Sequence, residues 1–348
     1  MNASFWSGKR VFLTGHTGFK GSWLALRLAD AGATVTGYAL PPETSPNAYD
    51  LLRIPERVTS ILADVRDAHT LAHAVQRGHP DVVVHMAAQP LVRRGYREPH
   101  ATFETNVMGT VNLLDAVRAC DGVAAVLVVT SDKTYANHAS RPQREDDPLG
   151  GDDPYSASKA CAEIVASAYR RSYFASGTRL ATARAGNVIG GGDFSEDRLI
   201  PDLVRASQQG EPVRLRYPHA IRPWQFVSDA LDGYLTIVER LASDSQIARA
   251  WNLGPQSDGL LTVEELARRF LRSYDPRTQI TIDPAAALPE APYLALDASA
   301  AREKLEWQPR YDADAAIEAT ASWYRTWRDG ADVVSLTLAQ MKPIAAVP

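Results

Sequence analysis

The chain has 348 residues, of which 45% are hydrophobic and 22% charged, as in an ordinary globular protein with one large domain or a domain and a smaller lobe. A net charge of −4 without a basic run argues against nucleic-acid binding, and two cysteines are too few for a disulfide framework. Since no apolar stretch reaches the ~20 residues that span a bilayer and the polar start lacks the core of a signal peptide, we expect a cytoplasmic protein with no membrane partner.

The first half of the chain alternates apolar runs with helical patterns. Predicted strands cover 11–13, 34–40, 58–63, 82–86, 124–130 and 180–185, and predicted helices cover 20–31, 68–78, 106–119 and 155–173. The continuous apolar run 82–86 is typical of a strand buried on both faces. This alternation predicts an α/β fold with a doubly wound parallel (Rossmann) sheet over residues 1–187, to which later segments contribute.

Beyond residue 187 the pattern is irregular. A glycine-rich loop covers 187–193, and prolines interrupt the segment that follows. Predicted short strands at 213–217 and 294–297 mix with helices at 229–241 and 263–274, and a short helix follows the last strand. We predict a smaller mixed α/β lobe over 188–330 and a C-terminal tail over 331–348, frayed across its last dozen residues.

Three glycines, Gly15, Gly18 and Gly21, lie between the first predicted strand and the first predicted helix. In a G-x-x-G-x-x-G pattern, one glycine allows the turn, one lets the backbone approach a pyrophosphate, and one lets the helix pack against the strand. The N–H groups at the start of the helix then face the phosphates. The motif predicts a dinucleotide-binding site.

Tyr155 and Lys159 are four residues apart at the start of a predicted helix, so they project from one face. An ammonium group nearby stabilises a phenolate, so we expect Lys159 to lower the pKa of Tyr155 until the tyrosine acts as a base near neutral pH. Ser131, at the end of strand 124–130, supplies a hydroxyl that completes a proton-transfer triad.

With these motifs, residues 9–310 resemble the extended short-chain dehydrogenases/reductases, the family of nucleotide-sugar epimerases and dehydratases. The resemblance also includes the run His85–Gln89 and the run Arg222–Val227. It implies NAD as a recycled cofactor. The cofactor-binding residues that it implies are Gly15, His16, Thr17, Gly18, Phe19, Lys20, Asp64, Val65, Ala87, Ala88, Gln89, Asn106, Tyr155 and Lys159.

Ser131-Asp-Lys133 stands where the family's 4,6-dehydratases generally carry Thr-Asp-Glu, and simple 4-epimerases lack the acidic pair. The branch that acts on CDP-glucose resembles this chain more closely, because it shares Ser-Asp-Lys, the glycine loop through Leu24 and the segment Arg184–Asp193. The resemblance implies dehydration of CDP-D-glucose to CDP-4-keto-6-deoxy-D-glucose, in deoxysugar biosynthesis for polysaccharides such as the lipopolysaccharide O-antigen.

The predicted catalytic residues are Ser131, Asp132, Lys133, Tyr155 and Lys159. Tyr155 takes the C4 hydroxyl proton as the nicotinamide takes the C4 hydride, and the resulting 4-ketone makes the C5 hydrogen acidic. Asp132, with a raised pKa, protonates the C6 hydroxyl so that it leaves as water. Lys133 is the candidate C5 base; the alternative is that it holds the substrate hydroxyls or Asp132 by charge, and another group is the base.

The second predicted strand ends at Leu40 without the carboxylate that usually binds the ribose 2′-hydroxyl of NAD. His16 and Lys20, inside the glycine loop, are placed to reach the adenosine ribose; the alternative is that both point to solvent. NAD remains the predicted cofactor, with tolerance of NADP left open.

We expect the lobe over 188–330 to bind the nucleotide sugar, with Arg222 on the diphosphate because arginine forks match phosphate oxygens. The predicted substrate-binding residues are Tyr96, Asn187, Asp193, Arg198, Arg216 and Arg222. His69 and His73 have metal-ligand spacing without an apparent third ligand, so no metal is predicted. The family also implies a homodimer, formed through the helices at 106–119 and 155–173.

Three other functions stay open. A 4,6-dehydratase for the glucose of another nucleotide would use the same residues. A nucleotide-sugar 4-epimerase would use Tyr155 and NAD but would not need Asp132 or Lys133. A dinucleotide-sensing scaffold without turnover would need none of the triad.

Overall fold

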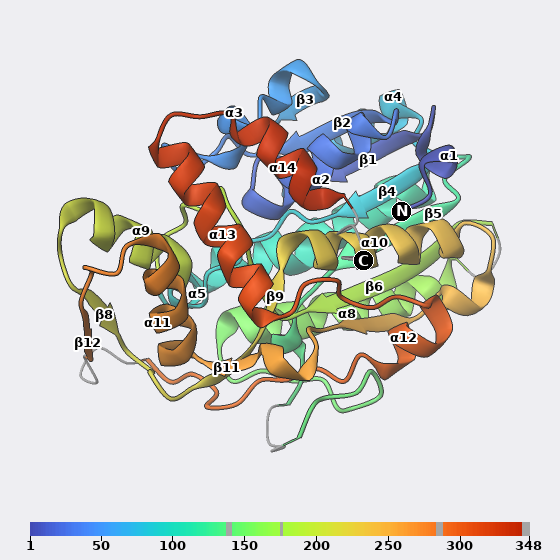
Figure 1. The fold of residues 1–348 in the computed structure, drawn as a ribbon. Coiled ribbons are helices and arrows are strands. Elements are labelled where there is room, and N and C mark those ends of the chain that lie inside the picture. The colour runs from blue at the N-terminus through green and yellow to red at the C-terminus, as the bar shows by residue number, and fades with distance from the viewer. Residues whose placement is uncertain (137–140, 175–176, 283–287, 343–348) are drawn as a thin grey trace.

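The computed structural model describes residues 1–136, 141–174, 177–282 and 288–342, and its centre is a seven-stranded sheet (Figure 1). The strand order is β10-β6-β5-β4-β1-β2-β3, and each strand runs parallel to its neighbours. The strands are β1 (Arg10–Thr14), β2 (Thr34–Ala39), β3 (Thr59–Leu62), β4 (Val82–His85), β5 (Ala125–Val129), β6 (Arg179–Ala185) and β10 (Ala250–Leu253). The predicted doubly wound sheet is confirmed.

Helices cover both faces of this sheet (Figure 1). Alternate strand residues point to opposite faces, so Val11 and Leu13 enter one hydrophobic core and Phe12 the other. The first core includes α2 (Phe19–Asp30) and α10 (Val227–Leu241); the second includes α4 (Ala68–Gly78), α7 (Gly109–Arg118) and α8 (Pro154–Ser172). Because both faces are buried, β5 is apolar throughout and β4 is apolar as far as His85.

The smaller lobe is mixed α/β, as predicted. It contains a three-stranded sheet in the order β11-β9-β7 and a two-stranded sheet of β12 and β8, against which helices pack. Its elements are β7 (Asn187–Ile189), α9 (Leu199–Gln209), β8 (Val213–Leu215), β9 (Ile221–Phe226), β11 (Leu260–Thr262), α11 (Val263–Tyr274), β12 (Ile280–Ile282) and α13 (Ala313–Arg328). Strand β9 runs parallel to β7 and antiparallel to β11.

The structure corrects several sequence-based boundaries in this half of the chain. The predicted loop 187–193 begins with strand β7, and Pro201, one of the prolines expected to interrupt the segment, lies inside α9. It is the third residue of α9, and a proline is tolerated in the first turn because its missing N–H would have no partner there. The segment 294–297 is no strand of a sheet; Leu296 only makes an isolated bridge to Gln143.

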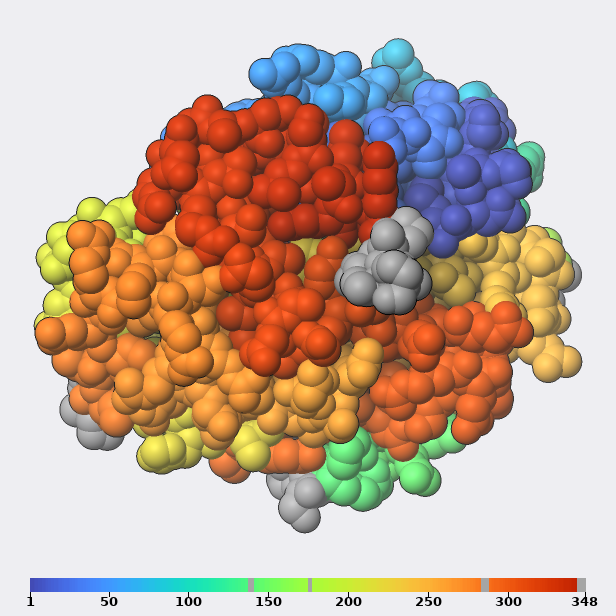
Figure 2. Space-filling model, viewed as in Figure 1, coloured from blue at the N-terminus to red at the C-terminus, as the bar shows by residue number. Residues whose placement is uncertain are grey.

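The C-terminal segment is more ordered than predicted. Helix α14 (Val333–Met341) buries Val333, Thr337 and Met341 against α13 and α2, so the prediction of a frayed end is wrong for 337–341. Figure 2 shows these last helices, in red, lying between the N-terminal part of the chain, in blue, and the orange residues that precede them. The rest of the predicted frayed end, 343–348, lies outside the described residues.

The remaining helices are short. They are α1 (Ala3–Trp6), α3 (Ala48–Leu51), α5 (Val92–Arg97), α6 (Pro99–Phe103) and α12 (Ser299–Leu305). Among the residues that the structure describes, none of the helices has both the length and the apolar character needed to cross a bilayer.

Candidate active site

The predicted catalytic residues come together where the strand order of the main sheet reverses, between β1 and β4. Open α/β sheets bind their ligands at this place, beyond the carboxyl ends of the strands. A cavity of about 290 Å³ lies there, walled on one side by the sheet edge and on the other by the smaller lobe. Its lining includes all five predicted catalytic residues: Ser131, Asp132, Lys133, Tyr155 and Lys159.

Asp132 is a buried carboxyl group in the wall of this cavity. The Ser131 hydroxyl donates a hydrogen bond to its Oδ1 at 2.9 Å, and its Oδ2 has no partner among the described residues. Burial raises the pKa of Asp132 above its usual value, against the charge of Lys133 and the hydrogen bond from Ser131. The shift favours a carboxyl group that keeps its proton and can donate it. Lys133 is half-buried in the same wall.

Tyr155 and Lys159 both lie in the first two turns of α8, whose first residue is Pro154 and whose N-cap is Asp153. The Lys159 ammonium donates to the Val129 carbonyl at 3.3 Å, and burial lowers its pKa to about 8. Burial raises the pKa of Tyr155, and this outweighs the opposing effects of the Ser131 hydroxyl and of the Arg198 charge. The prediction of a lowered tyrosine pKa is therefore wrong for the protein alone.

A buried glutamate that the sequence analysis missed fixes α8 to the sheet. Glu163 accepts hydrogen bonds from the hydroxyls of Thr130 and Thr182 and from Arg184, the last two at 2.8 Å. Thr130 directly precedes Ser131, and Glu163 is one helical turn beyond Lys159. The network therefore sets the position of the end of β5 relative to the catalytic helix.

The glycine loop fits the pyrophosphate of a dinucleotide. Helix α2 begins after Gly18, which provides no side-chain cap for the first N–H groups. A Cβ at Gly21 would lie 1.9 Å from the Gly15 carbonyl oxygen, so only glycine lets the helix approach the strand this closely. A Cβ at Gly18 would meet nothing nearer than 3.5 Å, so the outer side of the loop is open to a phosphate group.

The two polar side chains of the glycine loop have different surroundings. His16 is fully buried; its Nε2 shares a hydrogen bond of 2.6 Å with the Ser60 hydroxyl, its ring packs against Gly37, and burial lowers its pKa to about 4. Lys20 instead lines the catalytic cavity, donates to the Tyr234 hydroxyl at 3.3 Å, and has its pKa lowered to about 7 by burial. The alternative in which both point to solvent is wrong.

Asn106 is predicted to bind the cofactor, but its side chain forms hydrogen bonds within the protein. Its Oδ1 accepts from the Gln89 backbone N–H at 2.8 Å, and its Nδ2 donates to the Gln89 carbonyl and to the Ser158 hydroxyl. It lies in a π-helical turn, Glu104–Met108, that precedes α7. Asn106 therefore holds the loop that follows β4 against α8.

Other predicted cofactor residues also lie along the carboxyl edge of the sheet. Thr17 donates to the Leu40 carbonyl at 2.8 Å, and Asp64 forms an ion pair with Arg66 at 2.6 Å. The remaining positions are Phe19 at the start of α2, Val65 after β3, and Ala87 and Ala88 after β4. Of these four, Ala88 lines the cavity.

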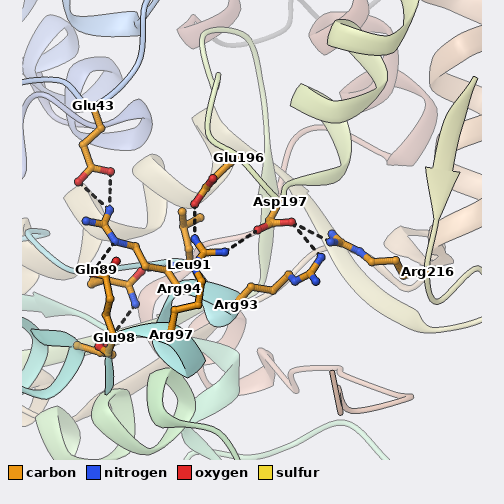
Figure 3. Close-up of polar contacts among 11 residues, drawn as sticks. Glu43, Gln89, Leu91, Arg93, Arg94, Arg97, Glu98, Glu196, Asp197 and Arg216 are labelled. Atoms are coloured by element: carbon orange, nitrogen blue, oxygen red, sulfur yellow. Dashed lines mark hydrogen bonds and ion pairs between the residues drawn. The ribbon is translucent and has the colours of Figure 1, made fainter. Parts of the chain in front are cut away.

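Five of the six predicted substrate residues line the cavity: Asn187, Asp193, Arg198, Arg216 and Arg222. Tyr96 lies outside the lining, where its hydroxyl donates to the Pro289 carbonyl at 3.3 Å. The sequence analysis missed Arg93, Asp197 and Glu290, which also line the cavity. Glu290 pairs with Arg222 at 3.4 Å, and Asp197 pairs with both Arg93 and Arg216 (Figure 3).

The lining contains eight lysine or arginine residues and five aspartate or glutamate residues, so it favours an anionic ligand. Within the described ranges, no group of three or more histidine, cysteine, aspartate or glutamate side chains is arranged to hold a metal ion.

Comparisons with known proteins find relatives of this chain in sequence and in fold. Residues 12–320 match the family described as GDP-mannose 4,6 dehydratase. The chain is 43% identical over 342 residues to the CDP-glucose 4,6-dehydratase of Salmonella typhimurium, covering 96% of this chain and 95% of that protein. The structure of DesIV, a dTDP-glucose 4,6-dehydratase from Streptomyces venezuelae with NAD and TYD bound, is 27% identical, with a TM-score of 0.78 over 93% of this chain and 99% of that one. An epimerase from Methanothermobacter thermautotrophicus, 22% identical with a TM-score of 0.81 over 94% and 95% of the two chains, has the same fold.

Proposed function

The chain belongs to the GDP-mannose 4,6 dehydratase family of NAD-dependent epimerases and dehydratases, and from this we propose that it dehydrates CDP-D-glucose to CDP-4-keto-6-deoxy-D-glucose. The observation that carries the proposal is the buried Asp132 with a raised pKa in the same cavity as Tyr155 and Lys159. A 4-epimerase has no use for a carboxylic acid there, whereas a dehydratase must protonate a leaving hydroxyl. The relative at 43% identity supports the choice of CDP-glucose.

We propose NAD as the cofactor, with its pyrophosphate at the N-terminus of α2 and its nicotinamide toward Tyr155. When bound, NAD supplies a hydride acceptor and returns the hydride within the same turnover, so that no net oxidation results. The open outer side of Gly18 and the uncapped first turn of α2 support this placement. The DesIV structure has NAD bound, which supports the choice of cofactor.

Tyr155 is the base for the C4 hydroxyl in this proposal. Its phenolic oxygen takes the proton as C4 becomes a ketone, while Ser131 orients the hydroxyl. The ammonium of Lys159 stabilises the phenolate electrostatically, and it carries that charge below its pKa of about 8.

Asp132 and Lys133 carry out the elimination. With a ketone at C4, Lys133 removes the C5 proton, the C–H electrons form the C5–C6 double bond, and the C6–oxygen bond breaks. The departing hydroxyl takes the proton of Asp132 and leaves as water. The double bond is then reduced, because the hydride returns to C6 and the proton held by Lys133 returns to C5. Asp132 and Lys133 are consecutive in a short 3-10 turn, Asp132–Thr134, that is capped by Ser131, and both line the cavity.

The division of labour between the two parts of the chain is also a proposal. Residues 1–187, together with α10 and β10, form the NAD-binding domain, and the remaining residues of 188–330 form the nucleotide-sugar lobe. Arg222, Asn187 and Arg216 are proposed to hold the diphosphate, because they line the cavity on the side of that lobe. Asp193 and Arg198 lie in the same wall, 3.7 Å apart as an ion pair.

We propose a homodimer through α8 and through α7 with the π-helical turn that precedes it, which contact one another. Met108 and Ile164 are more than one-third exposed in this region although they are apolar, and Phe103 and Tyr173 are exposed near them along the chain. A second copy would cover these side chains. Light scattering should give the mass of a dimer, and Ile164→Asp should give that of a monomer.

The function is tested by incubating the purified protein with NAD and, separately, with CDP-, dTDP-, GDP- and UDP-glucose, with the product masses as readout. The proposal expects loss of one water from CDP-glucose alone. Loss of water from another substrate would keep the reaction and overturn the nucleotide assignment. A 4-epimer of unchanged mass would overturn the dehydratase assignment itself.

A further inference from the structure

Asp197 lies in the cavity wall between two cavity-lining arginines that come from different parts of the fold, and a third arginine, Arg97, lies 4.0 Å from its Oδ2 (Figure 3). Its Oδ1 accepts a hydrogen bond from Arg216 at 2.8 Å and another from Arg93 at 3.3 Å. Arg93 is in α5, which follows β4 of the main sheet, and Arg216 follows β8 of the smaller lobe. A single carboxylate oxygen therefore connects the two walls of the cavity.

The two guanidinium groups keep most of their hydrogen-bonding capacity. Each uses only Nη1 on Asp197, and neither has another hydrogen-bond partner in the part of the chain that the structure describes. The side chains of Arg93 and Arg216 are 29% and 25% exposed, and both line the cavity. Without the carboxylate between them, two adjacent cations would repel each other. Asp197 therefore keeps them together while their other N–H groups remain available.

The backbone at Asp197 is unusual as well. Its φ of 57° lies in the left-handed region, which aspartate and asparagine adopt more readily than other non-glycine residues. This conformation is found immediately before Arg198, the N-cap of α9. An asparagine at position 197 would keep both the backbone conformation and the shape of the side chain, so Asp197→Asn removes little besides the charge.

We propose that Arg93 binds the diphosphate of the nucleotide sugar, and that Asp197 is the positioning residue that holds Arg93 and Arg216 as one fork across the two lobes. The inference rests on the proposed function for the identity of the ligand. Guanidinium groups match the oxygens of a diphosphate in geometry and charge, and a fork from two lobes can bind it on two sides.

The neighbouring pair on the same helix and loop provides a matched control. Arg97, one helical turn beyond Arg93, forms an ion pair with Glu196 at 2.7 Å and only a long one, of 4.0 Å, with Asp197 (Figure 3). The side chains of Arg97 and Glu196 are 54% and 60% exposed. Neither residue lines the cavity. Arg94 pairs instead with Glu43 at 2.8 Å, in the loop after β2. Of the three arginines of α5, Arg93 is therefore the one that lines the cavity.

The test is calorimetric titration of the full-length protein with CDP, which binds without turnover. Arg93→Met and Asp197→Asn should each weaken CDP binding by about tenfold or more, as expected for loss of a charge-assisted hydrogen bond. Glu196→Gln should bind CDP within about twofold of the wild type, because a pair as exposed as this one contributes little. In turnover of CDP-glucose, Asp197→Asn should raise KM and leave kcat within about twofold, since the reacting atoms lie elsewhere.

The direction in which Asp197→Asn changes CDP affinity shows whether Asp197 positions the arginines or acts only through its negative charge. Removing a negative charge from the cavity would strengthen the binding of an anion if only net charge mattered. Asp197→Asn that binds CDP as tightly as the wild type, or more tightly, overturns the proposal. The double variant with Arg93→Met and Asp197→Asn should lose less CDP affinity than the product of the two single fold-losses, because Asp197 acts partly through Arg93. A loss equal to that product would contradict this coupling.

Failure of the fork and failure of the proposed function give different results. If the wild type binds CDP and Asp197→Asn matches it, the fork is wrong and the function stands. If the wild type binds dTDP, GDP or UDP instead of CDP, the nucleotide assignment is wrong, and the same variants titrated with that diphosphate decide the fork. If none of the four diphosphates binds, both proposals are wrong.

Discussion

Two clusters of arginine and carboxylate side chains serve this protein in opposite ways. Beneath the catalytic helix, the side chains of Glu163 and Arg184 are 2% and 4% exposed, and the carboxylate is also bonded to Thr130 and Thr182. At the cavity wall, Asp197 is 22% exposed, and its arginines keep N–H groups available. Both clusters pair arginine with a carboxylate. In the first cluster, hydrogen bonds within the protein occupy both oxygens of Glu163, whereas in the second the arginines keep N–H groups that a ligand can accept from.

This difference predicts whether a substitution changes the stability of the fold or the function of the cavity. A charge left unpaired in a dry interior is costly, because no water replaces the lost partner. A partly hydrated pair loses little stability when it is broken, because water solvates both groups. We therefore expect changes beneath the helix to affect folding, and changes at the wall to affect binding and rate.

The largest effect on folding is expected from Glu163→Gln, which leaves the Arg184 charge unpaired in the interior. The free energy of unfolding should fall by about 3–5 kcal/mol. Urea unfolding measures it, with Asp197→Asn as the matched variant at the cavity wall, which should lose less than about 1 kcal/mol. Similar losses in the two variants would contradict the distinction between the clusters.

At the cavity wall, Lys133→Ala should change the rate and leave stability nearly unchanged. As the proposed C5 base, Lys133 should contribute about a hundredfold or more to proton transfer. The measurement is the rate at which solvent deuterium enters C5 of the sugar. An undiminished rate would mean that Lys133 only holds the substrate or Asp132, and that another group is the base.

A buried neutral group should make folding sensitive to acid. His16 has a folded-state pKa of about 4, and its ordinary value is 6.5, so between these values the unfolded chain binds more protons. The stability that His16 contributes above pH 6.5 is therefore lost as the pH falls toward 4, by about 2 kcal/mol between pH 7 and pH 5. Unfolding in urea at several pH values should show a shallower dependence in His16→Gln, and an unchanged slope would contradict this assignment.

The smallest of these effects concerns the pH dependence of the rate. Lys159 stabilises the Tyr155 phenolate only while it is protonated, and its pKa is about 8, so the rate should fall by about tenfold per pH unit above that value. Lys159→Arg keeps its charge, so its decline should begin at a higher pH even if the maximum is reduced. If the rates of the wild type and of Lys159→Arg decline at the same pH, the titration of another group causes the decline.

The main sheet and the catalytic set were predictable because their signals are local. Buried parallel strands are continuous apolar runs, the glycine motif lies between one strand and its helix, and Ser131, Tyr155 and Lys159 follow from where a strand ends and a helix begins. The parallel topology then brings these ends to one edge of the sheet. The pKa values of these residues also depend on burial, which the sequence does not show. For this reason the predicted direction of the Tyr155 pKa shift was wrong.

The smaller lobe and the ion pairs of the cavity could not be found in the same way. Strands β7 and β11 have three residues each, and β9 contains Pro223, so none gives a clear strand pattern. The contact between Arg93 and Asp197 joins residues 104 positions apart, and that between Arg222 and Glu290 joins residues 68 apart. Such pairs depend on how the two lobes pack, and no local motif marks them.

The role of Asp132 is the central claim, and Asp132→Asn tests it most directly with two substrates and mass detection. With CDP-glucose and NAD, the variant should lose water about a hundredfold more slowly than the wild type, because no carboxyl proton reaches the C6 hydroxyl. With the analogue that carries fluorine at C6, fluoride leaves without needing that proton, so the variant should eliminate it at nearly the wild-type rate. Equal impairment with both substrates would contradict the acid role, and undiminished loss of water from CDP-glucose would contradict the account as a whole.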